Sequence, residues 1–317
     1  MFILTPNIIT PQHLLLVAAL MLYTGIEHLS LMTYGWAILI IAVVLGALFQ
    51  LGIFNANNFA PKEQPGACQV VRTSEAGGTV VASLEGLCNG QLPEYVTQLN
   101  GNAYINVPAY VPPDGITNAF SVFAWVYVPV APGGDTHGGV VAQRCSSYCT
   151  WFVELYNNGA GRASPSFYYN GATYSWNQYA AATSFPLSTW QFVGFVVQGS
   201  TIYAYSDSVQ YPVAASYATN SLYLQQTWIG TRGDGICGSC IVGSIANVQV
   251  YNTSLSQAEV NALYSEGIGG APVKPQNLVG WWPLNGNAND YSGNNNNGAA
   301  TNVIYTGTWT NQYTGPV

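Results

Sequence analysis

The chain has 317 residues, of which 49 % are hydrophobic and only 6 % charged, with 6 Lys and Arg against 13 Asp and Glu. The net charge of −7 and the scarcity of cations exclude a nucleic-acid-binding protein, because such proteins need a basic surface to meet the phosphates. The hydrophobic share, together with 13 % aromatic residues, excludes a disordered chain.

The N-terminal part contains a long apolar tract. Between residues 14 and 54 the only charged residue is Glu27, and residues 29–54 carry none. As an α-helix, residues 29–54 would be about 39 Å long, more than the ~30 Å hydrocarbon core of a bilayer. Ala42 and Gly46 have the small-xxx-small spacing that lets a neighbouring helix approach closely. We expect a helix at 29–54 that lies in a membrane or in a filament core, preceded by a leader or hydrophobic extension at 1–28.

The stretch LMTYGWAILIIAVVLGALFQLGIFN, followed by NFAPKEQPGACQVVR, resembles the N-terminal region of archaeal pilin-like surface proteins. The resemblance implies that a peptidase removes the leader and that a Glu near the helix start faces the amine of the neighbouring subunit. Glu27 is the candidate for that assembly role, with Leu29 at the usual position of the family Glu and no Lys or Arg before Lys62. Without cleavage, the chain would be a single-pass membrane protein.

The next segment changes in composition. Residues 55–75 begin with NANNFAPKEQPGA, whose Asn, Pro and mixed charges are typical of a linker. From residue 76 to 317, short runs rich in Val, Ile, Tyr, Phe and Trp alternate with turn residues, which predicts a β-sandwich. The clearest strands are expected at 103–108, 120–129, 138–143, 151–157, 166–170, 190–198, 200–206, 227–231 and 244–252.

One helix is predicted inside this β region. Ser256 and Glu259 have the spacing of a capping box, Val260 and Leu263 supply an apolar side, and Gly267 ends the helix.

Two stretches, ANVQVYNTSLSQAEVNALYSEGIG and LVGWWPLNGNANDYSGNNNNGAATNV, resemble the landmarks of laminin-G-like, concanavalin A-like jelly rolls. FSVFAWVYVP and STWQFVGFVVQGSTIYAYSD are similar to the inner strands of that family, so the resemblance covers residues 99–305. The family normally opens with the GWWPLNGNA strand, which here follows the helix. Either the jelly roll is circularly permuted, with residues 278–284 in the missing strand position, or a second repeat is truncated; we favour permutation.

Six cysteines are present: Cys68, Cys88, Cys145, Cys149, Cys237 and Cys240. An even number after an N-terminal hydrophobic segment favours extracytoplasmic disulfides, although six cysteines allow fifteen pairings. Local pairing would join Cys68 to Cys88, Cys145 to Cys149, and Cys237 to Cys240. A zinc site formed by the last four is the alternative, because paired short spacings also suit tetrahedral zinc.

No catalytic motif is found. Hydrolysis of glycans needs two carboxylates about 5–10 Å apart, and no two acidic residues of the β region have the i, i+2 spacing that would place them on one strand face. P-loop, dinucleotide and nucleophile-elbow motifs are also missing. We therefore expect a protein that is not an enzyme.

Two kinds of binding site are expected. The family resemblance implies a Ca²⁺ site at Asp290 with Asn289 and Asn294, and an Asn-rich turn without a cation is the alternative because Asp290 is the loop's only charged residue. Tyr169, Tyr174 and Trp176 are candidates for sugar binding, since aromatic rings stack on sugars and nearby amides bond hydroxyls. Asn252 begins the N-x-[S/T] sequon Asn252-Thr253-Ser254 and is the expected glycosylation site.

These features predict a mainly β jelly roll that follows a long hydrophobic helix and is displayed outside the cell, on a membrane or in filaments. Its expected function is adhesion through a carbohydrate or another surface partner. The alternatives are a purely structural filament or envelope subunit, and a membrane-tethered glycan hydrolase.

Overall fold

The computed structural model describes residues 30–50, 61–74, 80–88, 91–108, 119–130, 137–144, 149–157, 163–169, 179–180, 186–199, 201–213, 226–233 and 236–316. The chain divides into two compact units, Met1–Phe59 and Ala60–Val317, and each is described by itself.

The first unit contains helix α2, Ser30–Gln50. Most of its large apolar side chains are exposed, among them Trp36, Ile40 and Phe49. Ala42 is half-buried, and Gly46 has no atom within 4 Å of the position that a Cβ would take, while Glu27 lies outside the described residues. Within the described part of the chain, no helix meets the length and apolarity needed to span a membrane.

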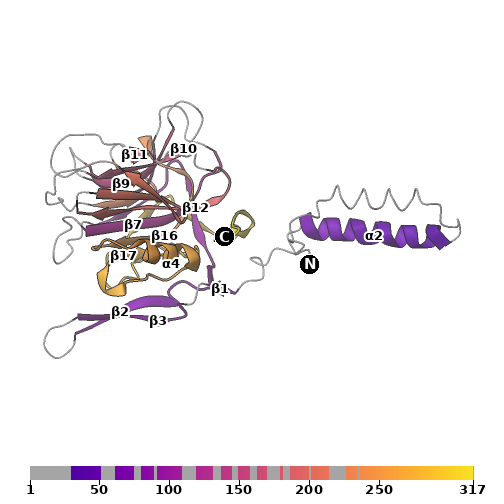
Figure 1. The fold of residues 1–317 in the computed structure, drawn as a ribbon, viewed down its shortest axis with the longest axis horizontal. Helices are drawn as coiled ribbons and strands as arrows, with labels where there is room; N and C mark the ends of the chain where they lie inside the picture. Colours follow the sequence, from indigo (N-terminus) through magenta and orange to yellow (C-terminus); the bar gives the residue numbers. More distant parts are fainter. Residues whose placement is uncertain are drawn as a thin grey trace. The chain divides into compact units, whose positions relative to one another are not determined.

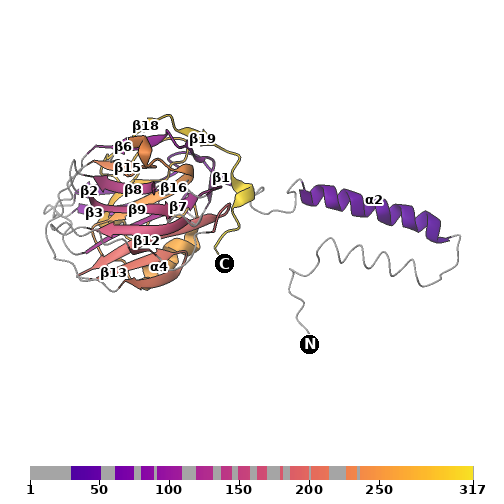
Figure 2. The ribbon, with the colours of Figure 1, turned by 90° about the horizontal axis from the view of Figure 1, so that it is seen from above.

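The second unit is a sandwich of two antiparallel sheets, which confirms the predicted mainly β architecture (Figure 1). Among the described residues, one sheet has seven strands in the order β11 (Tyr179–Ala180), β10 (Ala163–Tyr169), β9 (Cys149–Asn157), β8 (His137–Arg144), β15 (Thr227–Ile229), β6 (Tyr104–Val107) and β18 (Ala299–Thr301). The other has eight: β14 (Val209–Val213), β13 (Thr201–Ser206), β12 (Trp190–Gln198), β7 (Ala119–Tyr127), β16 (Val242–Tyr251), β5 (Val96–Asn100) and β19 (Ile304–Thr306), with β17 (Leu278–Trp282) also paired to β16. Figure 2 shows the strands of this unit from a perpendicular direction.

The central strands β7 and β12 of the eight-stranded sheet are buried on both faces. Alternate residues of β7, such as Phe120 and Val122, face the core between the sheets, whereas Phe123 and Trp125 belong to a second cluster on the outer face. Helix α4, Gln257–Glu266, covers that outer face with Val260 and Leu263. Strands buried on both faces need continuous apolar sequences, and this requirement explains why the runs around β7 and β12 lack polar alternation.

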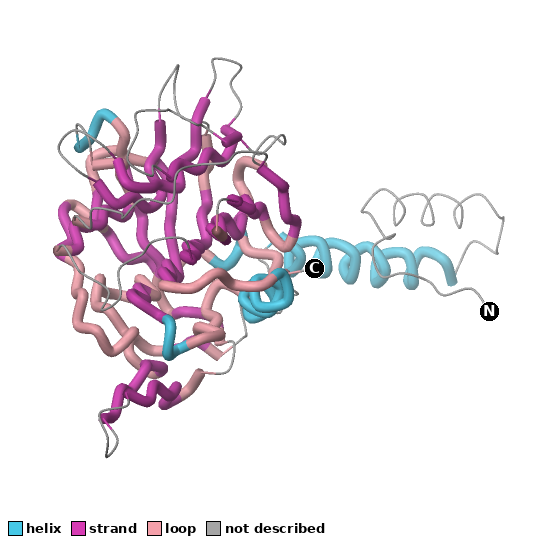
Figure 3. Tube along the Cα trace, turned by 60° about the vertical axis from the view of Figure 1, so that its left-hand side comes forward, coloured by secondary structure: helices cyan, strands magenta, loops and turns pink. Residues whose placement is uncertain are grey.

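Helix α4 begins and ends where its sequence predicts. The Ser256 hydroxyl accepts from the backbone N–H of Glu259, and the Glu259 carboxylate accepts from the backbone N–H of Ser256 at 2.7 Å. Gly267 follows at φ +79°, a conformation that favours glycine. Strands and loops make up most of the other described residues of this unit (Figure 3), with short 3₁₀ turns at Ile236–Gly238, Pro275–Asn277 and Thr310–Gln312.

The C-terminal stretch belongs to the same sandwich. Strand β17 pairs antiparallel with β16, β18 pairs with β6 of the other sheet, and β19 pairs with β5. A truncated second repeat would not be distributed over both sheets in this way. The pairings therefore match the permuted arrangement, in which β17 fills the strand position that is missing near the start of the domain.

The predicted linker at 55–75 is wrong for residues 61–74. These residues include β1 (Lys62–Glu63), which pairs with β4 (Leu92–Pro93), and β2 (Cys68–Ser74), which forms a hairpin with β3 (Val80–Gly86). Arg72 fixes the hairpin to the domain, because its guanidinium donates to the carbonyls of Ser292, Pro275 and Leu278. The polar composition of the preceding stretch concealed these contacts, which join residues about 200 positions apart.

Candidate functional site

The outer face of the seven-stranded sheet carries a group of aromatic and amide side chains. Ala103, Ile105 and Val107 point into the core, so the alternation along β6 places Tyr104 and Asn106 on the outer face. Strand β15 pairs with β6 so that Trp228 lies opposite Asn106. Gln226 is the residue immediately before β15. We call Tyr104, Asn106, Gln226 and Trp228 the β6–β15 patch.

The patch is partly solvated and ordered by its own contacts. The rings of Tyr104 and Trp228 meet edge to face, with centroids 5.5 Å apart. The Nδ2 atom of Asn106 donates to Oε1 of Gln226 at 3.4 Å. Gly233 supports the indole: at φ +83°, a Cβ there would lie only 2.7 Å from a ring atom of Trp228. The glycine therefore lets the backbone pack directly behind the ring.

The charges near the patch are paired. Glu154 of β9 is fully buried, and Nη1 of Arg232 lies 3.4 Å from its Oε2. Arg232 reaches the pair because Gly139 has no side chain; a Cβ at Gly139 would lie 2.2 Å from the Arg232 backbone nitrogen. The turn is held further by Thr231, whose hydroxyl accepts from the Gly233 N–H. The four patch side chains are neutral, so the patch offers ring faces and amide groups rather than charge.

The predicted sugar-binding residues cannot be placed together. Tyr169 is the last residue of β10, but its side chain is not among the described parts of the structure. Tyr174 and Trp176 lie wholly outside the described residues. Their role stays a prediction.

The β6–β15 patch was missed, because its members become neighbours only through the pairing of β6 with β15. The alternation of Tyr104 and Asn106 with apolar residues was the available signal.

Asp290 organises the Asn-rich turn. Its Oδ1 accepts from the backbone N–H groups of Trp281 and Ser292, and its Oδ2 accepts from the Ser292 hydroxyl and the Asn296 N–H, all at 2.9 Å. A carboxylate has about four acceptor positions, and protein donors fill them. Asn294 also turns its Nδ2 toward the carbonyls of Leu278 and Val279.

This arrangement does not fit a cation coordinated by Asp290. Asn289 is exposed, and its backbone N–H donates to Asn287. The described residues contain no group of three or more His, Cys, Asp or Glu that would hold a metal ion. The geometry favours the Asn-rich turn, and Ca²⁺ binding stays a prediction.

The cysteines follow the local pattern in part. Cys68 and Cys88 form the predicted disulfide. The sulfur atoms of Cys237 and Cys240 lie 2.8 Å apart but are not joined by a disulfide. Burial, and then the hydrogen bond with Cys237, raise the pKa of Cys240 to about 12, so this thiol stays protonated near neutral pH.

The strand register excludes a zinc ion shared by Cys149 and Cys240. Cys149 pairs with Arg144, whereas Cys240 bridges Gly139 at the other end of β8. Five residues of strand separate these positions by about 17 Å, and thiolates of one zinc site must lie about 2.3 Å from the metal. Cys145 and the side chain of Cys149 lie outside the described residues.

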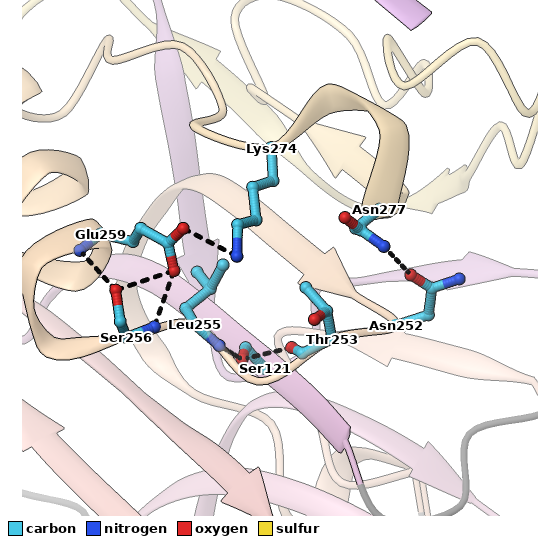
Figure 4. Close-up of polar contacts among 8 residues, drawn as sticks. All are labelled: Ser121, Asn252, Thr253, Leu255, Ser256, Glu259, Lys274 and Asn277. Carbon is cyan, nitrogen blue, oxygen red and sulfur yellow. Dashed lines mark hydrogen bonds and ion pairs between the residues drawn. The ribbon is translucent and has the colours of Figure 1, made fainter. Parts of the chain in front are cut away.

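The predicted glycosylation site is half-buried rather than fully exposed. The Oδ1 atom of Asn252 accepts from Nδ2 of Asn277 at 3.2 Å, and the Asn252 N–H donates to the Asn277 carbonyl (Figure 4). The hydroxyl of Ser254 in the same sequon donates to the Val197 carbonyl. Modification of the folded protein would have to break these contacts, and the prediction stays untested.

Residues 99–261 match the family model of the concanavalin A-like lectin/glucanases superfamily, a laminin-G-like model. The chain belongs to this superfamily.

A solved structure of another protein shows the same fold. A putative carbohydrate binding protein from Bacteroides ovatus is 12 % identical, covers 80 % of this chain and 72 % of its own, and gives a TM-score of 0.53. A heptameric SAP-like pentraxin from Limulus polyphemus is 15 % identical, with coverages of 67 % and 94 % and a TM-score of 0.48. No curated protein matches the chain.

Proposed function

We propose that the sandwich binds carbohydrate at the β6–β15 patch. The observation that carries the proposal is the edge-to-face pair of Tyr104 and Trp228, half-exposed beside the amides of Asn106 and Gln226. Membership of a superfamily that includes lectins, and the fold shared with a putative carbohydrate binding protein, support it.

The chemistry of the patch suits a saccharide. The apolar C–H face of a sugar ring packs on an indole or phenol ring, while side-chain amides both donate to and accept from sugar hydroxyls. Burial of about 60 Å² of apolar surface on Trp228 would contribute about 1.5 kcal/mol, or roughly a tenfold change in affinity. The proposal is binding without hydrolysis, so the sugar should be recovered unchanged.

The test is a glycan array followed by titration calorimetry on the full chain. Trp228→Ala should weaken binding of the selected glycan about tenfold or more, and Asn106→Ala should weaken it less. Trp36→Ala is the matched control, because Trp36 is an exposed tryptophan of α2 in the other unit. Unchanged affinity in Trp228→Ala, or the appearance of new reducing ends in the bound glycan, would contradict the proposal.

We also propose that the apolar tract at residues 29–54, which contains α2, attaches the sandwich to a surface, either in a membrane or in the core of a filament. The exposed apolar side chains of α2 support this, because apolar surface of that extent is normally covered. The Cys68–Cys88 disulfide supports a location outside the reducing cytoplasm.

Mass analysis of the N-terminal peptide, in sheared filaments and in membranes, tests the attachment. A new N-terminus between residues 25 and 29 in the sheared fraction would support a processed filament subunit. Retention of Met1 with all protein in the membrane fraction would support a plain membrane tether. Recovery of the protein from neither fraction would contradict attachment.

A further inference from the structure

A hollow lies on the opposite sheet from the β6–β15 patch. It has a volume of about 320 Å³ and lies between β13, β14 and the entry to α4. Its lining consists of Gln198, Tyr203, Tyr205, Gln210, Ser254, Leu255, Ser256 and Gln257. This volume is at the lower end of the ~300–1,000 Å³ typical of ligand pockets and suits a small ligand. We call it the α4 groove.

The groove is formed by defined contacts rather than by a loose loop. Tyr203 and Tyr205 alternate along β13, so both face the outer side of the eight-stranded sheet. The loop before α4 is fixed to the sheet, because the Ser121 hydroxyl donates to the Thr253 carbonyl and accepts from the Leu255 N–H (Figure 4). Across the groove, Nε2 of Gln257 donates to the Ser208 carbonyl in the β13–β14 turn.

Tyr205 lines this groove. The residue is only 1 % exposed, and its ring packs against Phe123. Burial, and then the neighbouring Tyr203, raise the pKa of Tyr205 to about 12, so the hydroxyl keeps its proton and acts as a donor as well as an acceptor.

Gln257 supplies an unsatisfied polar group in the groove. Its Nε2 is bonded, but its Oε1 is buried without a donor. A buried acceptor without a donor costs about 1–3 kcal/mol. The terminal torsion of a glutamine is broad, so the carboxamide can turn toward a bound hydroxyl.

We infer that the α4 groove is a second ligand site, which takes a neutral saccharide. A hydroxyl-rich ligand can donate to Gln257 and bond to the Tyr205 hydroxyl, while Gln198 and Gln210 offer further amides at the rim. No Asp, Glu, Lys or Arg is among the lining residues, so nothing there would compensate the desolvation of a charged sugar. The domain then has two binding sites, on opposite faces of the sandwich.

The experiment uses the full chain carrying Trp228→Ala, which removes the platform of the β6–β15 patch. This protein is applied to an array of neutral hexose and pentose oligosaccharides and of matched uronic-acid and sialylated glycans. We expect binding to neutral glycans only. Adding Tyr205→Phe, which deletes one hydroxyl, should weaken that binding at least tenfold while Tm changes little, because the substitution keeps the ring that packs against Phe123.

Tyr251→Phe is the matched control. It removes the hydroxyl of another buried tyrosine of the same sheet, one that donates to Gln249. This control should lower Tm and leave glycan binding intact. The second site is refuted if Trp228→Ala abolishes all glycan binding, if Tyr205→Phe leaves binding unchanged, or if acidic glycans bind as well as neutral ones. If only the proposal of the β6–β15 patch were wrong, the result would differ: Tyr205→Phe would weaken glycan binding, and Trp228→Ala would leave it unchanged.

Discussion

Replacing Asp290 by Asn should destabilise the sandwich strongly, with or without calcium. The substitution keeps the shape of the side chain but turns one acceptor oxygen into an NH₂ group. Each oxygen of Asp290 accepts two hydrogen bonds, so two of the four donors lose their acceptor. Hydrogen bonds to charged groups contribute about 1.5–3 kcal/mol each, which gives a loss of about 3–6 kcal/mol in the free energy of unfolding.

Urea denaturation followed by tryptophan fluorescence measures this loss, and calorimetry should show Tm falling by roughly 10 °C or more. Asn289→Ala is the matched control, because this exposed side chain of the same turn makes no hydrogen bond within the described structure. It should change stability by less than about 0.5 kcal/mol. A loss below about 1 kcal/mol for Asp290→Asn would refute the reasoning. So would a calcium-dependent rise in Tm that both substitutions abolish, since that result would make the turn a cation site.

Three further predictions concern other contacts. Burial raises the pKa of Glu63 from 4.5 to about 7, so the folded state binds a proton on this carboxylate more tightly than the unfolded state does. The stability gained from this tighter proton binding is complete below pH 4.5 and is lost as the pH rises through 7. For this half-buried group the loss of stability is about 1–2 kcal/mol after solvent screening. Glu63→Gln should therefore flatten the dependence of Tm on pH and raise Tm at pH 8. An unchanged dependence would show that Glu63 does not titrate with a raised pKa. Ser256→Ala should lower stability by about 1 kcal/mol in urea denaturation, because it removes the cap of α4, whereas Ser265→Ala, an exposed position in the same helix, should have little effect. Reduction of the Cys68–Cys88 disulfide, which links residues 20 positions apart, should cost about 3 kcal/mol, and equal midpoints with and without reductant would show that the hairpin alone restrains this segment.

The elements that were predictable from the sequence are those with a strong local signal. Strand β12 was predicted because WQFVGFVVQ is a continuous run of aromatic and β-branched residues. Helix α4 was predicted because Ser256 and Glu259 carry a capping box at the required spacing. The β2–β3 hairpin was missed, although its two Val-rich arms lie between Cys68 and Cys88, because the polar stretch before it was extended too far.

The candidate sites depend on contacts that local patterns do not encode. Tyr104 and Trp228 lie more than 120 positions apart and meet only through the pairing of β6 with β15. The α4 groove likewise joins β13 to residues about 50 positions later. Asp290 was identified for its family position, but three of its four hydrogen-bond donors are backbone N–H groups, whose positions depend on the folded chain. Sequence therefore indicated a binding fold, whereas the placement of its side chains required the sheets.

The position of the last three strands has a consequence for synthesis. β5 and β6 are among the first strands made, yet β19 and β18, which pair with them, lie at residues 299–306. Likewise, the carbonyl of Glu63 accepts a hydrogen bond from Nδ2 of Asn285, which is 222 positions later in the chain. The sandwich cannot complete its sheets until residues 299–306 have left the ribosome, and forming contacts between residues so far apart in sequence is slow. A sandwich that stays open until residues 299–306 are made can still be passed through a membrane pore as an unfolded chain, which is compatible with the location outside the cytoplasm proposed above.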